Sequence, residues 1–199
     1  MIEFVGQWGH ALAASLFGAM AIWLAQRSGG EREGRLLILA TFLTAVWALA
    51  VAMGGREALV GQIAEHGRNA AWLGFMYALW RRGQGGQGLF SVALLYGVLS
   101  AIIGLEVAVD ILPIWLVGAP RLLEAAYLAS MVLHMVVAVG ALVLVHNLYT
   151  AATPDARAAI RLHMVGLAAM WVYDLNLYTV SYLARGWSYE LFELRGIAA

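Results

Sequence analysis

The sequence predicts an all-α fold, a polytopic bundle of transmembrane helices, and two observations lead to this class. The first is composition: 63% of the 199 residues are hydrophobic, 12% are charged, and the mean hydropathy is +0.79. A soluble domain is seldom so apolar. The second is that the apolar residues fall into blocks of roughly 20 residues, the length that crosses a ~30 Å hydrocarbon core as a helix. We therefore predict six spans, at about 4–26, 34–54, 58–80, 89–110, 121–149 and 158–183.

The elements at the two ends of the chain need separate justification. The block at 4–26 contains Glu3 and His10 and lacks a basic n-region and a clear cleavage site, so we interpret it as a retained helix. Residues 186–199 are expected to form an outer loop and the start of a seventh span. Pro113, Pro120 and Pro154 are expected in loops between spans. The whole chain, 1–199, is thus predicted to be a single transmembrane domain.

The arginines predict the orientation of the bundle, because short cytoplasmic loops are enriched in basic residues. Only Arg56 and Arg121 belong to the loops after the second and fourth spans. The loops after the first, third and fifth spans hold Arg27, Arg32, Arg35, Arg81, Arg82, Arg157 and Arg161. We therefore expect the N-terminus outside the cytoplasm.

Composition also excludes several classes of function. The net charge is zero and no basic run is present, so no nucleic-acid partner is expected. Without Cys there is no thiol chemistry, and without Lys no retinal Schiff base can form. The glycine-rich connector at 83–88 lacks the Gly-Lys-Ser/Thr ending of a phosphate-binding loop.

The most informative pattern is a polar island within the apolar spans. A carboxylate at membrane depth costs about 2.5 to 3.5 kcal/mol, so Asp174 in the sixth span should face a protein interior or a wet cavity. At 1.5 Å per helical residue, ionisable groups of four spans reach the same outer leaflet. The candidate residues for a signal or ligand cavity are Glu65, Arg68, Asn69, Trp72, Glu106, Asp110, Tyr173, Asp174, Asn176 and Tyr178. Three interpretations stay open: polar contacts that fix helix packing, a ligand- or signal-sensing cavity, and a proton or ion path.

Helical spacing predicts which of these groups share a face. Glu65 and Arg68 are three residues apart and can pair along one helix. Glu106 and Asp110 are four apart, so the two carboxylates point the same way and invite a cation or an arginine.

The five histidines raise the hypothesis of a bis-histidine haem, because imidazoles on facing helices can clamp iron. His134 is expected near mid-membrane, whereas His66 is expected in the outer half and His146 and His163 at the cytoplasmic end. These depths do not pair across two helices. The sequence therefore predicts no metal site and no cofactor.

Several local patterns together resemble a known family. They are Glu65-x-x-Arg68-x-x-Ala71-Trp72, His146-Asn147-Leu148-Tyr149, Tyr173-Asp174-Leu175-x-Leu177-Tyr178 and Arg195-Gly196. In order and spacing they resemble the N-terminal membrane sensor region of the PEP-CTERM/exosortase-system sensor histidine kinases. The family has an acidic residue where this chain has His146, so no role is carried over to that position.

The resemblance implies a multi-pass sensor of the bacterial inner membrane that works as a homodimer among membrane lipids. It implies cytoplasmic GAF, dimerisation and ATP-binding domains beyond Ala199, through which a response regulator would be phosphorylated. On this interpretation the chain is a fragment without catalytic residues that passes a stimulus to an ATP-dependent protein-histidine kinase.

A small six-helix secondary transporter, or proton-coupled carrier, is the alternative, because the same intramembrane carboxylates could move protons. Carriers often contain inverted repeats and helices broken near the midplane. The first and second sets of three spans show no convincing similarity, which favours the sensor. An intramembrane protease is not expected, since no His-Glu-x-x-His pattern occurs.

Overall fold

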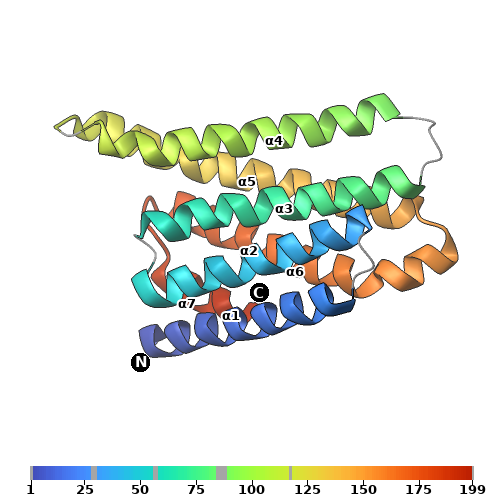
Figure 1. Ribbon diagram of the computed structural model, residues 1–199. Coiled ribbons are helices and arrows are strands. Elements are labelled where there is room, and N and C mark those ends of the chain that lie inside the picture. Colours follow the sequence, from blue (N-terminus) through green and yellow to red (C-terminus); the bar gives the residue numbers. More distant parts are fainter. Residues whose placement is uncertain (1, 28–30, 56–57, 84–88, 117, 199) are drawn as a thin grey trace.

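The computed structural model describes residues 2–27, 31–55, 58–83, 89–116 and 118–198, and the described chain is all-helical (Figure 1). Residues 84–88 of the connector predicted at 83–88, and Arg56, lie outside these residues. A 3-10 turn at Leu112–Ile114 follows the fourth helix. The α-helices are α1 (Ile2–Arg27), α2 (Arg32–Gly54), α3 (Leu59–Gly83), α4 (Leu89–Ile111), α5 (Pro120–Ala151), α6 (Pro154–Leu183) and α7 (Tyr189–Ala198).

The six long helices run roughly side by side along one bundle axis (Figure 1). Each packs against the next in the chain, from α1 with α2 through to α5 with α6, and α3 also touches α5. The short helix α7 turns back from α6 and packs mainly against α1. Its end, and so the C-terminus, lies part-way along the bundle rather than at one end (Figure 1).

Four of the described helical segments are long and apolar enough to cross a membrane: Glu3–Arg27, Arg32–Gly54, Ser91–Ile114 and Pro120–Ala151. They correspond to α1, α2, α4 and α5. Helices α3 and α6 have 25 and 30 residues, but polar residues interrupt their apolar runs. The two helices that lack a continuous apolar run are thus the two that carry most of the polar island.

Prolines begin two helices, which corrects the expectation that all three lie in loops. Pro120 and Pro154 are the first residues of α5 and α6, and Pro113 lies in the 3-10 turn. The first helical position suits proline because its missing N–H would have no partner within the helix. Before Pro154, the Thr153 hydroxyl accepts a hydrogen bond from the Ala156 amide, which caps α6.

Apolar packing forms two clusters that flank the polar residues. The larger joins α3, α4, α5 and α6 around Trp72, Met76 and Trp171. The smaller joins α1, α2, α6 and α7 around Trp47, Leu177 and Phe192. The site described next lies between them, in the half of the bundle nearer the start of α1.

Candidate functional site

Four charged side chains form a buried group that we call the ion cluster: Glu65 and Arg68 on α3, Asp174 on α6 and Arg195 on α7. All four are buried, and Arg68 is fully enclosed. Two carboxylates face two guanidinium groups, so the ion cluster is neutral as a whole. Charges of opposite sign in direct contact are the condition under which charged groups are tolerated at such depth.

Arg195 makes the most contacts in the ion cluster. Its Nε donates to Asp174 Oδ1 at 2.6 Å, and its Nη1 donates to Glu65 Oε2 at 2.8 Å. Its Nη2 donates to the second oxygen of Glu65. The Glu65 carboxylate is therefore held in the two-bond geometry that arginine favours, and helix α7 is tied by one side chain to both α3 and α6.

Arg68 completes the ion cluster from the other side. Its Nη2 donates to Asp174 Oδ2 at 2.9 Å, and the Asn69 side-chain oxygen accepts from the same guanidinium. The indole of Trp47 lies 4.2 Å from Arg68 Cζ and 4.9 Å from Arg195 Cζ, measured to the ring centroid. One ring thus contributes cation–π attraction to both cations, which counts for more in a dry interior than in water.

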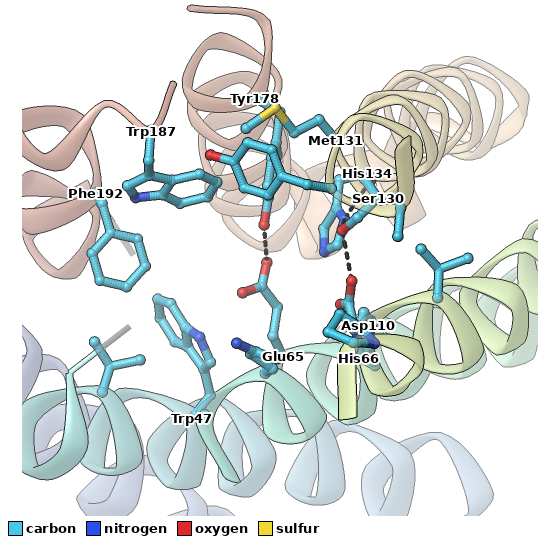
Figure 2. Close-up of a pocket in the computed structure, with 17 residues that line it drawn as sticks. Trp47, Glu65, His66, Asp110, Ser130, Met131, His134, Tyr178, Trp187 and Phe192 are labelled. Atoms are coloured by element: carbon cyan, nitrogen blue, oxygen red, sulfur yellow. Dashed lines mark hydrogen bonds and ion pairs between the residues drawn. The ribbon is translucent and has the colours of Figure 1, made fainter. Parts of the chain in front are cut away.

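Tyr178 connects the ion cluster to a second group of side chains. Its hydroxyl donates to Glu65 Oε1 at 2.8 Å (Figure 2). Its ring lies over His134 on α5, with a centroid distance of 4.3 Å. Tyr178 therefore contacts a carboxylate of one group and an imidazole of the other.

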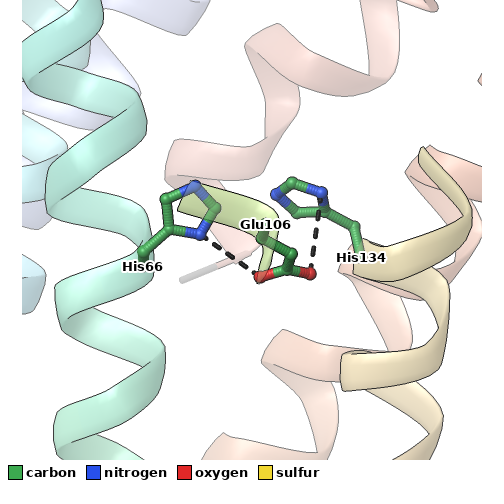
Figure 3. Close-up of side chains that lie close together, drawn as sticks. All are labelled: His66, Glu106 and His134. Carbon is green, nitrogen blue, oxygen red and sulfur yellow. Dashed lines mark ion pairs between the residues drawn. The ribbon is translucent and has the colours of Figure 1, made fainter. Parts of the chain in front are cut away.

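The second group, which we call the histidine cluster, consists of His66 on α3, Glu106 and Asp110 on α4, and Ser130 and His134 on α5. His66 Nε2 lies 2.9 Å from Asp110 Oδ2, and the Ser130 hydroxyl donates to Asp110 Oδ1 at 2.6 Å. His66 Nδ1 lies 3.2 Å from Glu106 Oε2, and His134 Nδ1 lies 3.7 Å from Glu106 Oε1 (Figure 3). In the described part of the chain, the ion-pair partners of both carboxylates are histidines.

A cavity of about 170 Å³ borders both groups. Figure 2 shows Glu65, His66, Asp110, Ser130, His134 and Tyr178 on its wall, with Trp47, Trp187 and Phe192 on the opposite side. Ionisable groups thus face aromatic rings across a space that can admit water or a small ligand.

The structure places the sequence-predicted residues as follows. Glu65, Arg68, Asn69, Asp174 and Tyr178 meet in or beside the ion cluster. Glu106 and Asp110 share a face, as the spacing predicted, and they meet histidines rather than an arginine.

Other predicted residues lie at the margin of the site. Trp72 is buried and donates from Nε1 to Thr44 Oγ1 at 3.0 Å, so it joins α3 to α2. The Tyr173 hydroxyl donates to the Leu191 carbonyl at 2.6 Å, which fastens α7. Asn176 is exposed on the outside of α6 and does not reach the site.

The predicted pairing of Glu65 with Arg68 along one helix is weak. Their nearest atoms, Glu65 Oε1 and Arg68 Nη2, are 4.0 Å apart. Each has a shorter contact on another helix, Glu65 with Arg195 and Arg68 with Asp174. Contacts between helices have taken the place of the local pair.

The expectation that the histidine depths do not pair is wrong for His66 and His134. Their ring centroids are 5.4 Å apart. The expected depths of the histidines assumed that the ends of the predicted spans are level. In the structure, the end of α4 and the start of α5 extend beyond the end of α2 and the start of α3 (Figure 1). This overhang brings His134 to the level of His66.

Sequence reasoning also missed Arg195 as a member of the site. It lies 21 positions beyond Asp174, in a segment interpreted as the start of another span. The usable signal was charge balance, because Glu65, Arg68 and Asp174 leave one negative charge without a partner.

Comparisons with family models, with curated proteins and with solved structures find no match to this chain. The function must therefore be argued from the site itself. The site suits three roles: a neutral network of buried ion pairs that fixes the helices, a cavity that binds a small ligand, and a group of histidines that binds a cation.

Proposed function

We propose that this chain is the membrane-embedded signal-sensing region of a two-component sensor histidine kinase of the bacterial inner membrane. One observation carries the proposal: three of the four patterns that resemble the family converge in space. Glu65 and Arg68 on α3, Asp174 on α6 and Arg195 on α7 form one ion cluster. Residues far apart in sequence thus meet at one buried point, which is where a change in helix arrangement would be felt.

The proposal includes six spans with the N-terminus outside the cytoplasm. Helices α3 and α6 would measure about 38 and 45 Å at 1.5 Å per residue, enough to cross a ~30 Å core. Asp174, the charged residue in the apolar run of α6, is buried inside the bundle, while Leu162, Val165 and Val172 are exposed on the outer face, as contact with lipid requires. More basic residues lie at the end of the bundle away from the site, where α1 and α3 end and α2 and α6 begin, than at the other end, which holds Arg121 and Arg185. This asymmetry supports a cytoplasmic location for the more basic end.

A sensor needs two arrangements between which a stimulus discriminates. Helix α7 is the element suited to move, because it is short and its polar ties to the bundle are few and specific. The Arg195 ion pairs and the Tyr173–Leu191 hydrogen bond both fasten it. A ligand in the adjacent cavity that competes for Glu65 would weaken the hold on α7, and the kinase beyond would read the displacement.

The test starts from the native reading frame after the codon for Ala199. The proposal predicts a further span and then dimerisation and ATP-binding domains, in a protein that autophosphorylates as a homodimer and transfers phosphate to a response regulator. In that full-length protein, Asp174→Asn together with Glu65→Gln should change the stimulus dependence of phosphotransfer. Glu31→Gln, at an exposed glutamate, serves as the matched control. A frame that stops at Ala199, or an unchanged output from a folded double variant, would refute the proposal.

A proton-coupled carrier is the second candidate, and one observation favours it. Titratable groups follow one another from Asp174 through Glu65 and Tyr178 to His134 and Glu106. Such a row could pass protons along the cavity wall. Proton uptake by proteoliposomes containing the purified chain, abolished by Glu65→Gln, would establish the carrier in place of the sensor.

A further inference from the structure

The histidine cluster contains more negative charge than its own residues neutralise. Glu106 is fully buried and Asp110 is partly buried, and no arginine reaches either of them in the described chain. With both imidazoles neutral, the cluster carries two negative charges beside an ion cluster that is already neutral. A divalent cation at this place would bring the histidine cluster to neutrality.

The hydrogen bond of His66 with Asp110 determines which ring nitrogen carries the proton. A carboxylate only accepts, so Nε2, at 2.9 Å from Asp110 Oδ2, is the donor. In neutral His66 the lone pair then belongs to Nδ1, which faces Glu106 Oε2 at 3.2 Å. This approach lacks the alignment of a hydrogen bond. Two electron-pair donors therefore face each other, and that arrangement calls for a cation between them.

His134 is oriented in the same way by its own helix. Its Nδ1 lies 2.9 Å from the Ser130 carbonyl, which only accepts, so Nδ1 carries the proton. The lone pair of neutral His134 then belongs to Nε2. Figure 3 shows this second nitrogen on the side of the ring nearer His66, whereas the marked contact with Glu106 runs to Nδ1.

Glu106 supplies the anionic donor. Neither of its oxygens has a hydrogen bond from the residues that the structure describes, although the side chain is fully buried. A buried carboxylate without hydrogen bonds is costly. One atom each of His66, Glu106 and His134 lie within 4.8 Å of one another. Ligands of a tetrahedral zinc ion are roughly 3.4 Å apart, so a contraction of at most about 1.4 Å between any two of these atoms would form the site.

We propose that His66, Glu106 and His134 bind a divalent transition metal ion, with Zn²⁺ the ion that two imidazoles and one carboxylate suit best. Asp110 and the Ser130 carbonyl orient the two imidazoles, as supporting groups around metal ligands commonly do. The cavity beside His66 and His134 leaves room for a water or ligand at a fourth position. The proposal concerns binding alone and is independent of the sensor role.

The test is Zn²⁺ binding by the purified full chain, stripped with a chelator and titrated in detergent, with bound metal measured after desalting. We expect one Zn²⁺ per chain, and Co²⁺ in its place should give the visible absorption of a low-coordinate nitrogen and oxygen site. Glu106→Gln and His134→Gln should each abolish stoichiometric binding, and Asp110→Asn should weaken it by about 10- to 100-fold. His146→Gln, which removes an exposed histidine of the same helix, should leave binding unchanged.

Two results would overturn the proposal. One is a wild-type chain that retains no Zn²⁺ and shows no Co²⁺ absorption, which would mean that a protonated His66 neutralises the site instead. The other is binding that survives both Glu106→Gln and His134→Gln, which would mean adventitious metal elsewhere. Circular dichroism and thermal unfolding of the metal-free variants show whether a variant has lost a metal ligand or has failed to fold. The Co²⁺ spectrum of the wild-type chain tests the site without any substitution.

Discussion

Replacing Arg195 by Gln should destabilise the bundle more than any comparable surface change. Arg195 is 2% exposed and gives three hydrogen bonds to Glu65 and Asp174. Without it, the remaining ion cluster has two carboxylates and only Arg68, so one negative charge is left buried and uncompensated. Breaking a buried pair by removing one partner typically costs about 3 to 5 kcal/mol. We expect a loss of unfolding free energy in that range.

The assay is reversible unfolding in mixed detergent micelles, followed by circular dichroism. Arg161→Gln, at an exposed arginine of α6, is the matched control and should change stability by less than about 1 kcal/mol. Glu65→Gln combined with Arg195→Gln restores neutrality, so the double variant should lose less stability than the sum of the two single variants. A loss below about 1 kcal/mol for Arg195→Gln, or strictly additive effects, would contradict the buried ion cluster.

Two further changes test the contacts around the ion cluster. Tyr178→Phe removes only the hydroxyl that donates to Glu65 at 2.8 Å, so it should lower the free energy of unfolding by about 1.5 to 3 kcal/mol in the same assay. An unchanged stability would mean that this bond is not formed. Gly196→Ala places a Cβ 2.5 Å from the His10 backbone nitrogen and should destabilise the packing of α7 on α1 by about 1 to 3 kcal/mol. Gly166→Ala, in the open on α6, should be neutral or stabilising, and equal effects of the two alanines would argue against the close approach.

The positions of the long helices could be predicted from sequence because an apolar block of membrane-spanning length is a local signal. The six predicted blocks coincide with α1 to α6, and no boundary differs by more than four residues. The shared faces of Glu106 with Asp110 and of Asp174 with Tyr178 were also local, since helical spacing alone determines them. All four of these residues contact other members of the site.

The contacts between helices could not be predicted in the same way. Whether His134 lies level with His66 depends on how far α5 extends beyond α3, and one sequence does not encode that offset in any short pattern. The part played by Arg195 depends on the turn after α6, which places α7 against α1 and brings the Arg195 side chain to Asp174. Both errors arise from relative placement of helices, not from the character of any residue.

The measurement that tests this account most directly is a cross-link between α1 and α7, because only a returned α7 brings Arg195 to Glu65 and Asp174. The chain has no native Cys, so any disulfide within it must join the introduced cysteines. A Cβ at Gly6 would lie 2.7 Å from the Glu193 Cβ, about 1 Å closer than in an ordinary disulfide, so a small shift suffices. Gly6→Cys with Glu193→Cys should form an intramolecular disulfide on mild oxidation in native membranes, and neither single variant should. If the double variant stays reduced under conditions that oxidise accessible thiols, α7 does not return to the bundle and the ion cluster does not form.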